Sequence, residues 1–251
     1  MSTGFDATAL TGFSAAEAYD AHRPSYIKPA VDDLLTQLRV SGVPRAKILD
    51  LAAGTGKFTE LLAVRDERYQ ILAVEPHQQM LAKLKEKRLR GVEVREGDAV
   101  FATPEALASI ARTLRPAGKL GLIWNIEDYN QARDYPTKTR WESDLRTINW
   151  KYTTDTSPRY KDVAWAAAFE GQSVFSPIEE KIFEVKVWLE KEALWQRLGT
   201  LSNIANLSDG EKDDLRDDFD EVLEDAVDVE RNGKGEIAVH YIVHTAWATK
   251  I

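Results

Sequence analysis

The sequence predicts an α/β protein with a doubly wound, mostly parallel Rossmann-like sheet, an antiparallel C-terminal hairpin edge and a helical cap. Two observations support this fold class. Residues 47–59, KILDLAAGTGKFT, have the pattern of a buried strand, a glycine turn and the start of a helix. Near the C-terminus, residues 181–190 and 236–247 alternate as half-buried strands do, and they should pair antiparallel.

The N-terminal half alternates between helix and strand patterns. A capping box opens a short helix at residues 14–19, which Pro24 ends or redirects. Apolar spacing then predicts helix 29–40, strand 47–51, a helix from 57, strand 69–74, helix 80–90, strand 92–95, helix 103–114 and strand 119–124. This order is typical of a parallel sheet covered on both faces.

The C-terminal half departs from this alternation. Residues 126–178 are aromatic and polar, which predicts a cap. A helix around residues 194–204 and another that begins with the capping box at Ser208 separate the two C-terminal strands. Asn232-Gly233 turns the chain into the last strand.

Length and composition predict one globular domain that acts on small molecules. The 251 residues are 43% hydrophobic and 29% charged, with a net charge of −8. The acidic charge disfavours nucleic acid as a partner, and no apolar run reaches the ~18 residues of a membrane helix. The absence of cysteine excludes disulfides and thiolate sites and fits the cytoplasm. The oligomeric state stays open.

The glycine turn predicts a ligand site. Gly54 and Gly56 lack the Cβ atoms that would keep a ligand from the backbone, and N–H groups at the opening helix face a small polar or anionic group. A P-loop is excluded, because Leu51 and Phe58 occupy its required glycine and hydroxyl positions. A dinucleotide fingerprint is disfavoured by Thr59, which stands where a glycine or alanine is expected, so a nicotinamide-dependent oxidoreductase is the less favoured reading.

An acid followed by three spacers and Gly-x-Gly resembles motif I of the class I S-adenosylmethionine-dependent methyltransferases. The segments DLAAGTGKFT, YDAHRPSY and PEALASIARTLRPAGKLGLIWN are similar to the type 11 small-molecule family, including the trans-aconitate methyltransferase-like group, over roughly residues 13–126. The resemblance implies S-adenosyl-L-methionine as cofactor and methyl transfer to a small carboxylate or hydroxyl acceptor. It divides the single domain into a cofactor-binding core (14–125), a cap or substrate region (126–178) and C-terminal edge elements (179–251).

The resemblance also implies which residues bind the cofactor. These are Asp50, Ala52, Gly54 and Gly56 at the turn, Glu75 for the ribose hydroxyls, Asp98 for the adenine amino group, and Tyr19 and Arg23 for the methionine carboxylate. Ala52 stands where many members of the family have a first glycine. Glu75 has independent support, because an acid about 25 residues past the turn ends the second strand, where it can accept from both ribose hydroxyls.

The sequence gives fewer candidates for the binding site of the methyl acceptor. Trp124 and Asn125 end their strand near the expected pocket mouth and are the candidate substrate residues. No catalytic residue is assigned, although a hydroxyl acceptor would require a base such as His22 or His77. A metal site is rejected, because four residues along a strand hold His240 and His244 roughly 13 Å apart.

The sequence departs from the family between Ala99 and Thr103. The family has roughly 25 further residues here, including a fourth parallel strand and an aromatic segment. Either residues 119–124 lie beside residues 48–51 in a sheet that is one strand short, or the product folds poorly. We therefore predict that this is a deletion form of an otherwise ordinary methyltransferase. The alternative function is a catalytically impaired protein that still binds the cofactor.

Overall fold

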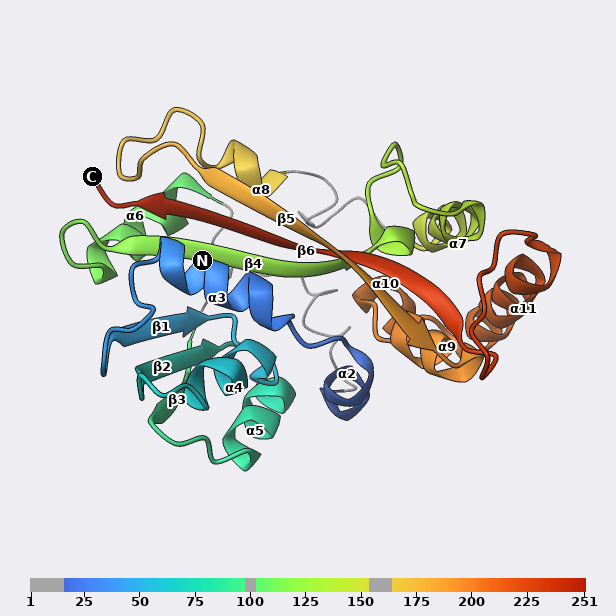
Figure 1. Cartoon of the computed structure of the whole chain (residues 1–251), viewed down its shortest axis with the longest axis horizontal. Coiled ribbons are helices and arrows are strands. Elements are labelled where there is room, and N and C mark those ends of the chain that lie inside the picture. Colours follow the sequence, from blue (N-terminus) through green and yellow to red (C-terminus); the bar gives the residue numbers. More distant parts are fainter. Residues whose placement is uncertain (1–15, 98–102, 154–163) are drawn as a thin grey trace.

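The computed structural model describes residues 16–97, 103–153 and 164–251 (Figure 1). In these residues six strands form two three-stranded sheets. The parallel sheet has the order β1-β2-β3, with β1 (Lys47–Leu51), β2 (Gln70–Glu75) and β3 (Val92–Glu96). The antiparallel sheet has the order β4-β6-β5, with β4 (Lys119–Glu127), β5 (Glu179–Leu189) and β6 (Ile237–Thr249). The mixed sheets and flanking helices confirm the predicted Rossmann-like α/β class.

The helices of the first half are α2 (Ala16–His22), α3 (Lys28–Gln37), α4 (Lys57–Ala63), α5 (Gln78–Glu86) and α6 (Pro104–Thr113). Helix α6 begins as its sequence predicts: the Thr103 hydroxyl accepts from the Ala106 N–H, and Pro104 occupies the first turn, where no N–H is needed. Helix α5 ends at Glu86, shorter than predicted, because Arg88 and Gly91 adopt positive φ angles that end a helix.

The second half contributes the 3₁₀ turn η1 (Asp128–Asn130), α7 (Arg140–Lys151), α8 (Ala164–Ala167), α9 (Lys191–Gly199), α10 (Ser202–Ala205) and α11 (Asp209–Asp225). Helix α11 starts at the predicted capping box, where Ser208 and Glu211 bond reciprocally. The helix predicted at 194–204 is divided into α9 and α10, which Thr200 and Leu201 separate. The predicted antiparallel pairing of the two C-terminal strands is confirmed: β5 pairs with β6, and α9, α10 and α11 lie between them in the sequence.

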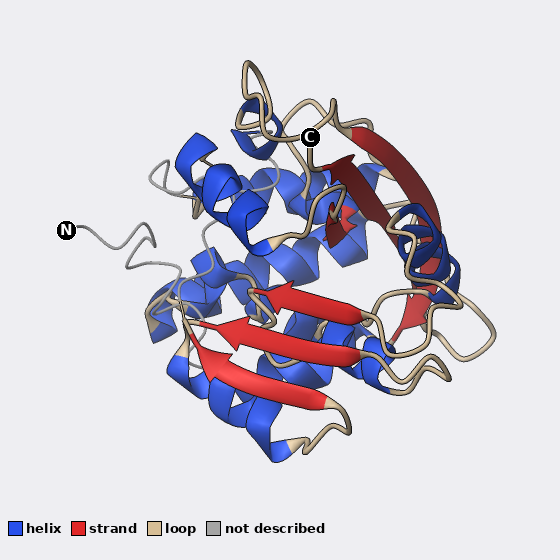
Figure 2. Ribbon diagram, turned by 90° about the vertical axis from the view of Figure 1, so that its left-hand side faces the viewer, coloured by secondary structure: helices blue, strands red, loops and turns tan. Residues whose placement is uncertain are grey.

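Helices cover both faces of the parallel sheet (Figure 2). On one face, side chains of α3, α4 and β2 form a core around Leu35, Leu62 and Ile71. Leu84 of α5 packs on the same face with Ala53 and Ala73, since Ala73 lies two residues from Ile71 along β2. On the other face, Leu51 of β1 packs with Leu107 and Ile110 of α6. A further core joins α7 to α9, α10 and α11 at the far end of the long strands (Figure 1).

The two sheets are not joined by hydrogen bonds in the described residues. Strand β4 pairs with β6 along its whole length and does not pair with β1, so the prediction that it lies bonded beside residues 48–51 is wrong. Helix α3 spans both strands instead: Ile48 of β1 and Ile123 of β4 pack against the same core, and Gly121 lies so close that a Cβ there would be 2.9 Å from Leu38. Apolar packing under α3 thus takes the place of a strand ladder.

Candidate functional site

The glycine turn between β1 and α4 forms as the sequence predicts. Ala52, Gly54 and Gly56 all have positive φ angles, of 56°, 59° and 88°. Glycine adopts this left-handed conformation at little cost, whereas a side chain with a Cβ is strained there by about 1–2 kcal/mol. The conformation explains why glycine suits these positions, and it identifies Ala52 as the strained member.

Replacing Ala52 with glycine should therefore stabilise the protein. We expect Ala52→Gly to raise the free energy of unfolding by about 0.5–1 kcal/mol, because relief of the strain exceeds the extra entropy lost by glycine. Urea unfolding of the two proteins measures the difference. A loss of stability in the variant would show that the Ala52 methyl group packs more favourably than its backbone angle costs.

Glu75 at the end of β2 fixes the turn. The residue is 5% exposed, and its two carboxylate oxygens accept from the Gly54 N–H at 2.8 Å and from the His77 N–H at 2.9 Å. Burial raises the pKa of Glu75, while these two N–H groups oppose the rise. A carboxylate has about four lone-pair positions, so two remain for further hydrogen bonds. Glu75 thus stabilises the turn and can also accept hydrogen bonds from a ligand with hydroxyl groups.

Asp50 on β1 lies beneath the same turn. Its carboxylate accepts from the Thr59 hydroxyl of α4 at 2.5 Å. Burial raises the pKa of Asp50 to about 6, the Thr59 hydrogen bond opposes the rise, and the charge of Glu75 adds to it. The half-buried Asp50 and the buried Glu75 therefore face one turn, an arrangement that favours a ligand carrying a positive charge.

The raised pKa gives a stability prediction. Because the Asp50 pKa of about 6 lies above its unfolded value, the folded state loses stability as the pH rises from about 4 to about 6, and the whole penalty is present above pH 6. Asp50→Asn should therefore stabilise the ligand-free protein by about 2 kcal/mol at pH 7.5 and by almost nothing at pH 4. Urea unfolding at both pH values tests this; a gain equal at the two pH values would refute the assigned pKa.

Helix α2 is tied to the turn through a residue that the sequence analysis missed. Asp20 accepts from the Thr55 hydroxyl at 2.6 Å and from Lys87 Nζ at 2.8 Å, and its carbonyl oxygen accepts from Lys57 Nζ at 2.5 Å. Asp20 directly follows Tyr19 in the YDAHRPSY segment, so its position in that segment is the signal that could have identified it.

The other end of α2 contacts the end of β4. Arg23 Nη1 lies 3.3 Å from both carboxylate oxygens of Glu127, and its guanidinium lies 5.5 Å over the Tyr19 ring. The Asn125 amide donates to the carbonyl oxygen of Pro24 at 3.0 Å. Glu127 is fully buried, and the sequence analysis did not single it out. These contacts place α2 between the glycine turn and the end of β4.

The structure separates the two candidate substrate residues. Asn125 lies on the face of β4 that meets α2, whereas Trp124 lies on the opposite face, with its ring 4.7 Å from that of Trp165 and 5.5 Å from that of His244. Asp98 lies outside the described residues. The turn residues Asp50, Ala52, Gly54 and Gly56 thus meet Glu75, with Tyr19 and Arg23 on the helix beside them.

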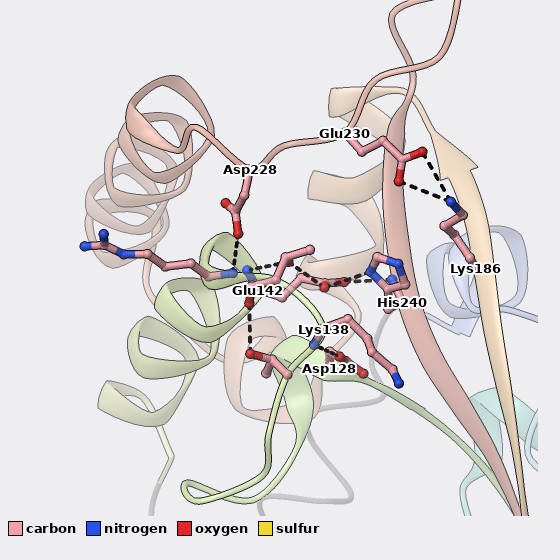
Figure 3. Close-up of polar contacts among 10 residues, drawn as sticks. Asp128, Lys138, Glu142, Lys186, Asp228, Glu230 and His240 are labelled. Carbon is pink, nitrogen blue, oxygen red and sulfur yellow. Dashed lines mark hydrogen bonds and ion pairs between the residues drawn. The ribbon is translucent and has the colours of Figure 1, made fainter.

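The two histidines of β6 bond to carboxylates on different elements. His240 donates its N–H to Glu142 Oε1 at 2.7 Å and lies 2.9 Å through Nδ1 from Glu142 Oε2 (Figure 3), whereas His244 Nε2 lies 2.8 Å from Glu180. Among residues 16–97, 103–153 and 164–251, no three His, Cys, Asp or Glu side chains are grouped as a metal would require. In the same ranges no helix has the length and apolar character needed to cross a membrane.

Comparison with known proteins finds relatives that are named as methyltransferases. The chain is 29% identical over 224 residues to an uncharacterized methyltransferase-like protein of Schizosaccharomyces pombe, covering 81% of this chain and 82% of the relative. It is 34% identical over 134 residues to an uncharacterized methyltransferase of Mycobacterium bovis, covering 46% of this chain and 52% of the relative. No family model matches.

A solved structure agrees at the level of the fold. A protein described as a type II methyltransferase of Anaeromyxobacter dehalogenans superposes with a TM-score of 0.53 at 16% identity, covering 91% of this chain and 97% of that one. The chain therefore has the Rossmann-like fold of this protein and homologues named as methyltransferases.

Proposed function

We propose that the protein is an S-adenosyl-L-methionine-dependent methyltransferase that acts on a small-molecule acceptor with a carboxylate or hydroxyl group. The observation that carries the proposal is the hydrogen bond from the Gly54 N–H to Glu75, which joins the open turn to a buried ribose acceptor. Resemblance to the type 11 family and homologues named as methyltransferases support it. A cytoplasmic location is part of the same proposal.

The residues fit the cofactor. Gly54 has no Cβ to block an approaching ligand, and even a built Cβ would have Met80 Sδ as its nearest atom, at 3.8 Å. Glu75 retains lone pairs for the two ribose hydroxyls, and Asp50 offers its carboxylate to the cofactor's ammonium group. Arg23 has a buried Nε with no partner in the described residues, a donor suited to the methionine carboxylate.

The protein's own contribution is positioning. When bound, S-adenosylmethionine supplies a methyl group on a positively charged sulfur, and its transfer is an in-line displacement. Glu75 and the turn backbone orient the adenosine half, while α2 covers the site and excludes water through the contacts of Asp20 and Arg23. A carboxylate acceptor needs no base, because it is already a nucleophile.

A second candidate function is a cofactor-binding protein with impaired catalysis. The separation of β1 from β4 favours it, because these strands flank the position where the family has its fourth strand and the aromatic segment beside the reactive methyl group. We infer that this chain is a deletion form of such an enzyme, from exon skipping or a mistaken gene model. A transcript that encodes residues 97–104 without an alternative exon would count against the deletion.

Turnover separates the two candidates. The protein is incubated with methyl-labelled S-adenosylmethionine and panels of carboxylate, hydroxyl and amine acceptors, and the release of S-adenosylhomocysteine is measured. Transfer to carboxylates or hydroxyls, lost in Gly54→Ala, supports the methyltransferase. Cofactor binding without transfer to any panel supports the impaired form, and transfer to amines alone contradicts the proposed acceptor class.

A further inference from the structure

Three buried hydrogen-bond donors near the end of β4 have no partner in the described residues. They are Arg23 Nε, the Tyr129 hydroxyl and Arg197 Nη1. Tyr129 is fully buried, and Arg197 is 8% exposed. An unpartnered buried donor costs about 1–3 kcal/mol, and more when it is charged. Three such donors indicate that a ligand rich in acceptor atoms, or ordered water, satisfies them.

The three donors gather around one buried carboxylate. Arg23 contacts Glu127 directly. Burial raises the pKa of Tyr129 well above its usual value; the charge of Glu127 raises it further, while Arg197 and Arg23 lower it. Both guanidiniums and the carboxylate therefore act on the same hydroxyl, which stays protonated and available as a donor at physiological pH.

Arg197 is held in place by helix α2. Its Nε donates to the His22 carbonyl oxygen at 3.2 Å, which fixes the plane of the guanidinium and leaves Nη1 for another acceptor. Burial raises the pKa of Tyr19, and the charges of Arg23, Glu127 and Glu75 also act on it. Burial likewise raises the pKa of Tyr241, on which the charges of Arg197 and Glu127 act. Arg197 also lies close enough to Lys57, at the start of α4, for its charge to lower the pKa of that lysine, so Arg197 stands beside α2 between the glycine turn and the end of β4.

The charges around Glu127 are unbalanced. One carboxylate faces two guanidiniums, and the nearby buried Glu142 is already bonded to Thr139 and to the His240 N–H. Among the described residues, Arg197 forms no ion pair with a carboxylate, so its charge has no direct counterion there. A carboxylate suits such a place, because its oxygens only accept hydrogen bonds and a guanidinium binds them with strong charge-assisted bonds.

We propose that Arg197 and Tyr129 form a subsite for the carboxylate of the methyl acceptor, beside Arg23, whose open Nε the proposed function gives to the cofactor. The assignment rests on the proposed methyl transfer. The subsite explains why an arginine of the C-terminal helices is buried against α2 with an open nitrogen. It assigns anionic acceptors to the protein, and Arg197 is its specificity-determining residue.

Formate and formamide give a matched test of the subsite, because they have nearly the same shape and differ in charge. In thermal unfolding of the full chain, sodium formate should raise the melting temperature by about 2 °C over sodium chloride at equal ionic strength, and formamide should not. Arg197→Met and Arg197→Lys should both remove the shift, the second because it keeps the charge but loses the guanidinium fork. Arg216→Met, at a partly exposed arginine that pairs with Glu192, should keep it.

The cofactor's own carboxylate is the competing source, and a second arm distinguishes it. We expect Arg197→Met to bind S-adenosylhomocysteine within twofold of the unchanged protein. A tenfold loss, with unchanged affinity for 5′-methylthioadenosine, which lacks the amino-acid part, would assign the subsite to the cofactor and overturn the proposal. Equal shifts from formate, formamide and chloride would also overturn it and leave only water there. If the unchanged protein does not bind S-adenosylhomocysteine at all, the proposed function fails, and this result is distinct from a failure of the subsite.

Discussion

Gly54→Ala is expected to reduce S-adenosylhomocysteine affinity at least about 100-fold, equivalent to about 2.7 kcal/mol, while the protein stays folded. Among the described residues other than its two chain neighbours, the built Cβ would meet no atom closer than 3.8 Å, so the fold tolerates it apart from about 1 kcal/mol of strain at a φ of 59°. The same methyl group would stand where the cofactor must approach the backbone. Calorimetric titration measures the affinity, and urea unfolding measures the stability.

Gly42→Ala is the matched control for this variant. Gly42 has a φ of 71°, and in the described part of the chain no atom beyond its two neighbours lies within 4 Å of its built Cβ, so the variant should show the same strain with unchanged affinity. Gly56→Ala should behave differently, because its Cβ would lie 2.3 Å from Leu84 Cδ1 and would destabilise the protein by about 2–4 kcal/mol. Unchanged affinity in Gly54→Ala would remove the turn from the cofactor site.

Removing the carboxylate charge of Glu127 should destabilise the protein by about 3–5 kcal/mol. Its side chain is fully buried and that of Arg23 is 15% exposed, so Glu127→Gln leaves a desolvated guanidinium without its counterion. Removing both charges, in Arg23→Met with Glu127→Gln, should cost less than the sum of the two single changes. Denaturant unfolding of the unchanged protein, the two single variants and the double variant gives the coupling energy between Arg23 and Glu127.

The exposed pair of Lys186 and Glu230 is the control for the buried one. Its side chains are 43% and 54% exposed, so Glu230→Gln should cost at most about 0.5 kcal/mol. Equal losses in Glu127→Gln and Glu230→Gln, or additivity in the double variant, would show that the contact between α2 and β4 does not hold the helix over the site.

Local chemistry made much of the fold predictable. The caps at Thr103 and Ser208 fixed two helix starts, and apolar alternation located β5 and β6. The turn at Gly54 and the acid at Glu75 could be paired in advance, because parallel strands end at the same edge of a sheet.

Contacts between distant segments could not be predicted in the same way. The pairing of Arg23 with Glu127 joins residues 104 positions apart, and no periodicity encodes it. The opposite directions of Trp124 and Asn125 follow from strand geometry, but the face that meets α2 depends on packing. The unpartnered Nη1 of Arg197 can be recognised only when all the hydrogen bonds of the buried side chains around it are known.

The most direct measurement of the central claim is a calorimetric titration of the full chain with S-adenosylhomocysteine and, separately, with NAD, each repeated on Glu75→Gln. We predict that S-adenosylhomocysteine binds with one site per chain and that NAD does not bind. Glu75→Gln should weaken the binding of S-adenosylhomocysteine about tenfold or more, because a carboxylate accepts hydroxyl hydrogen bonds more strongly than an amide. Binding of NAD alone, or affinity for S-adenosylhomocysteine that Glu75→Gln leaves unchanged, would contradict the central claim.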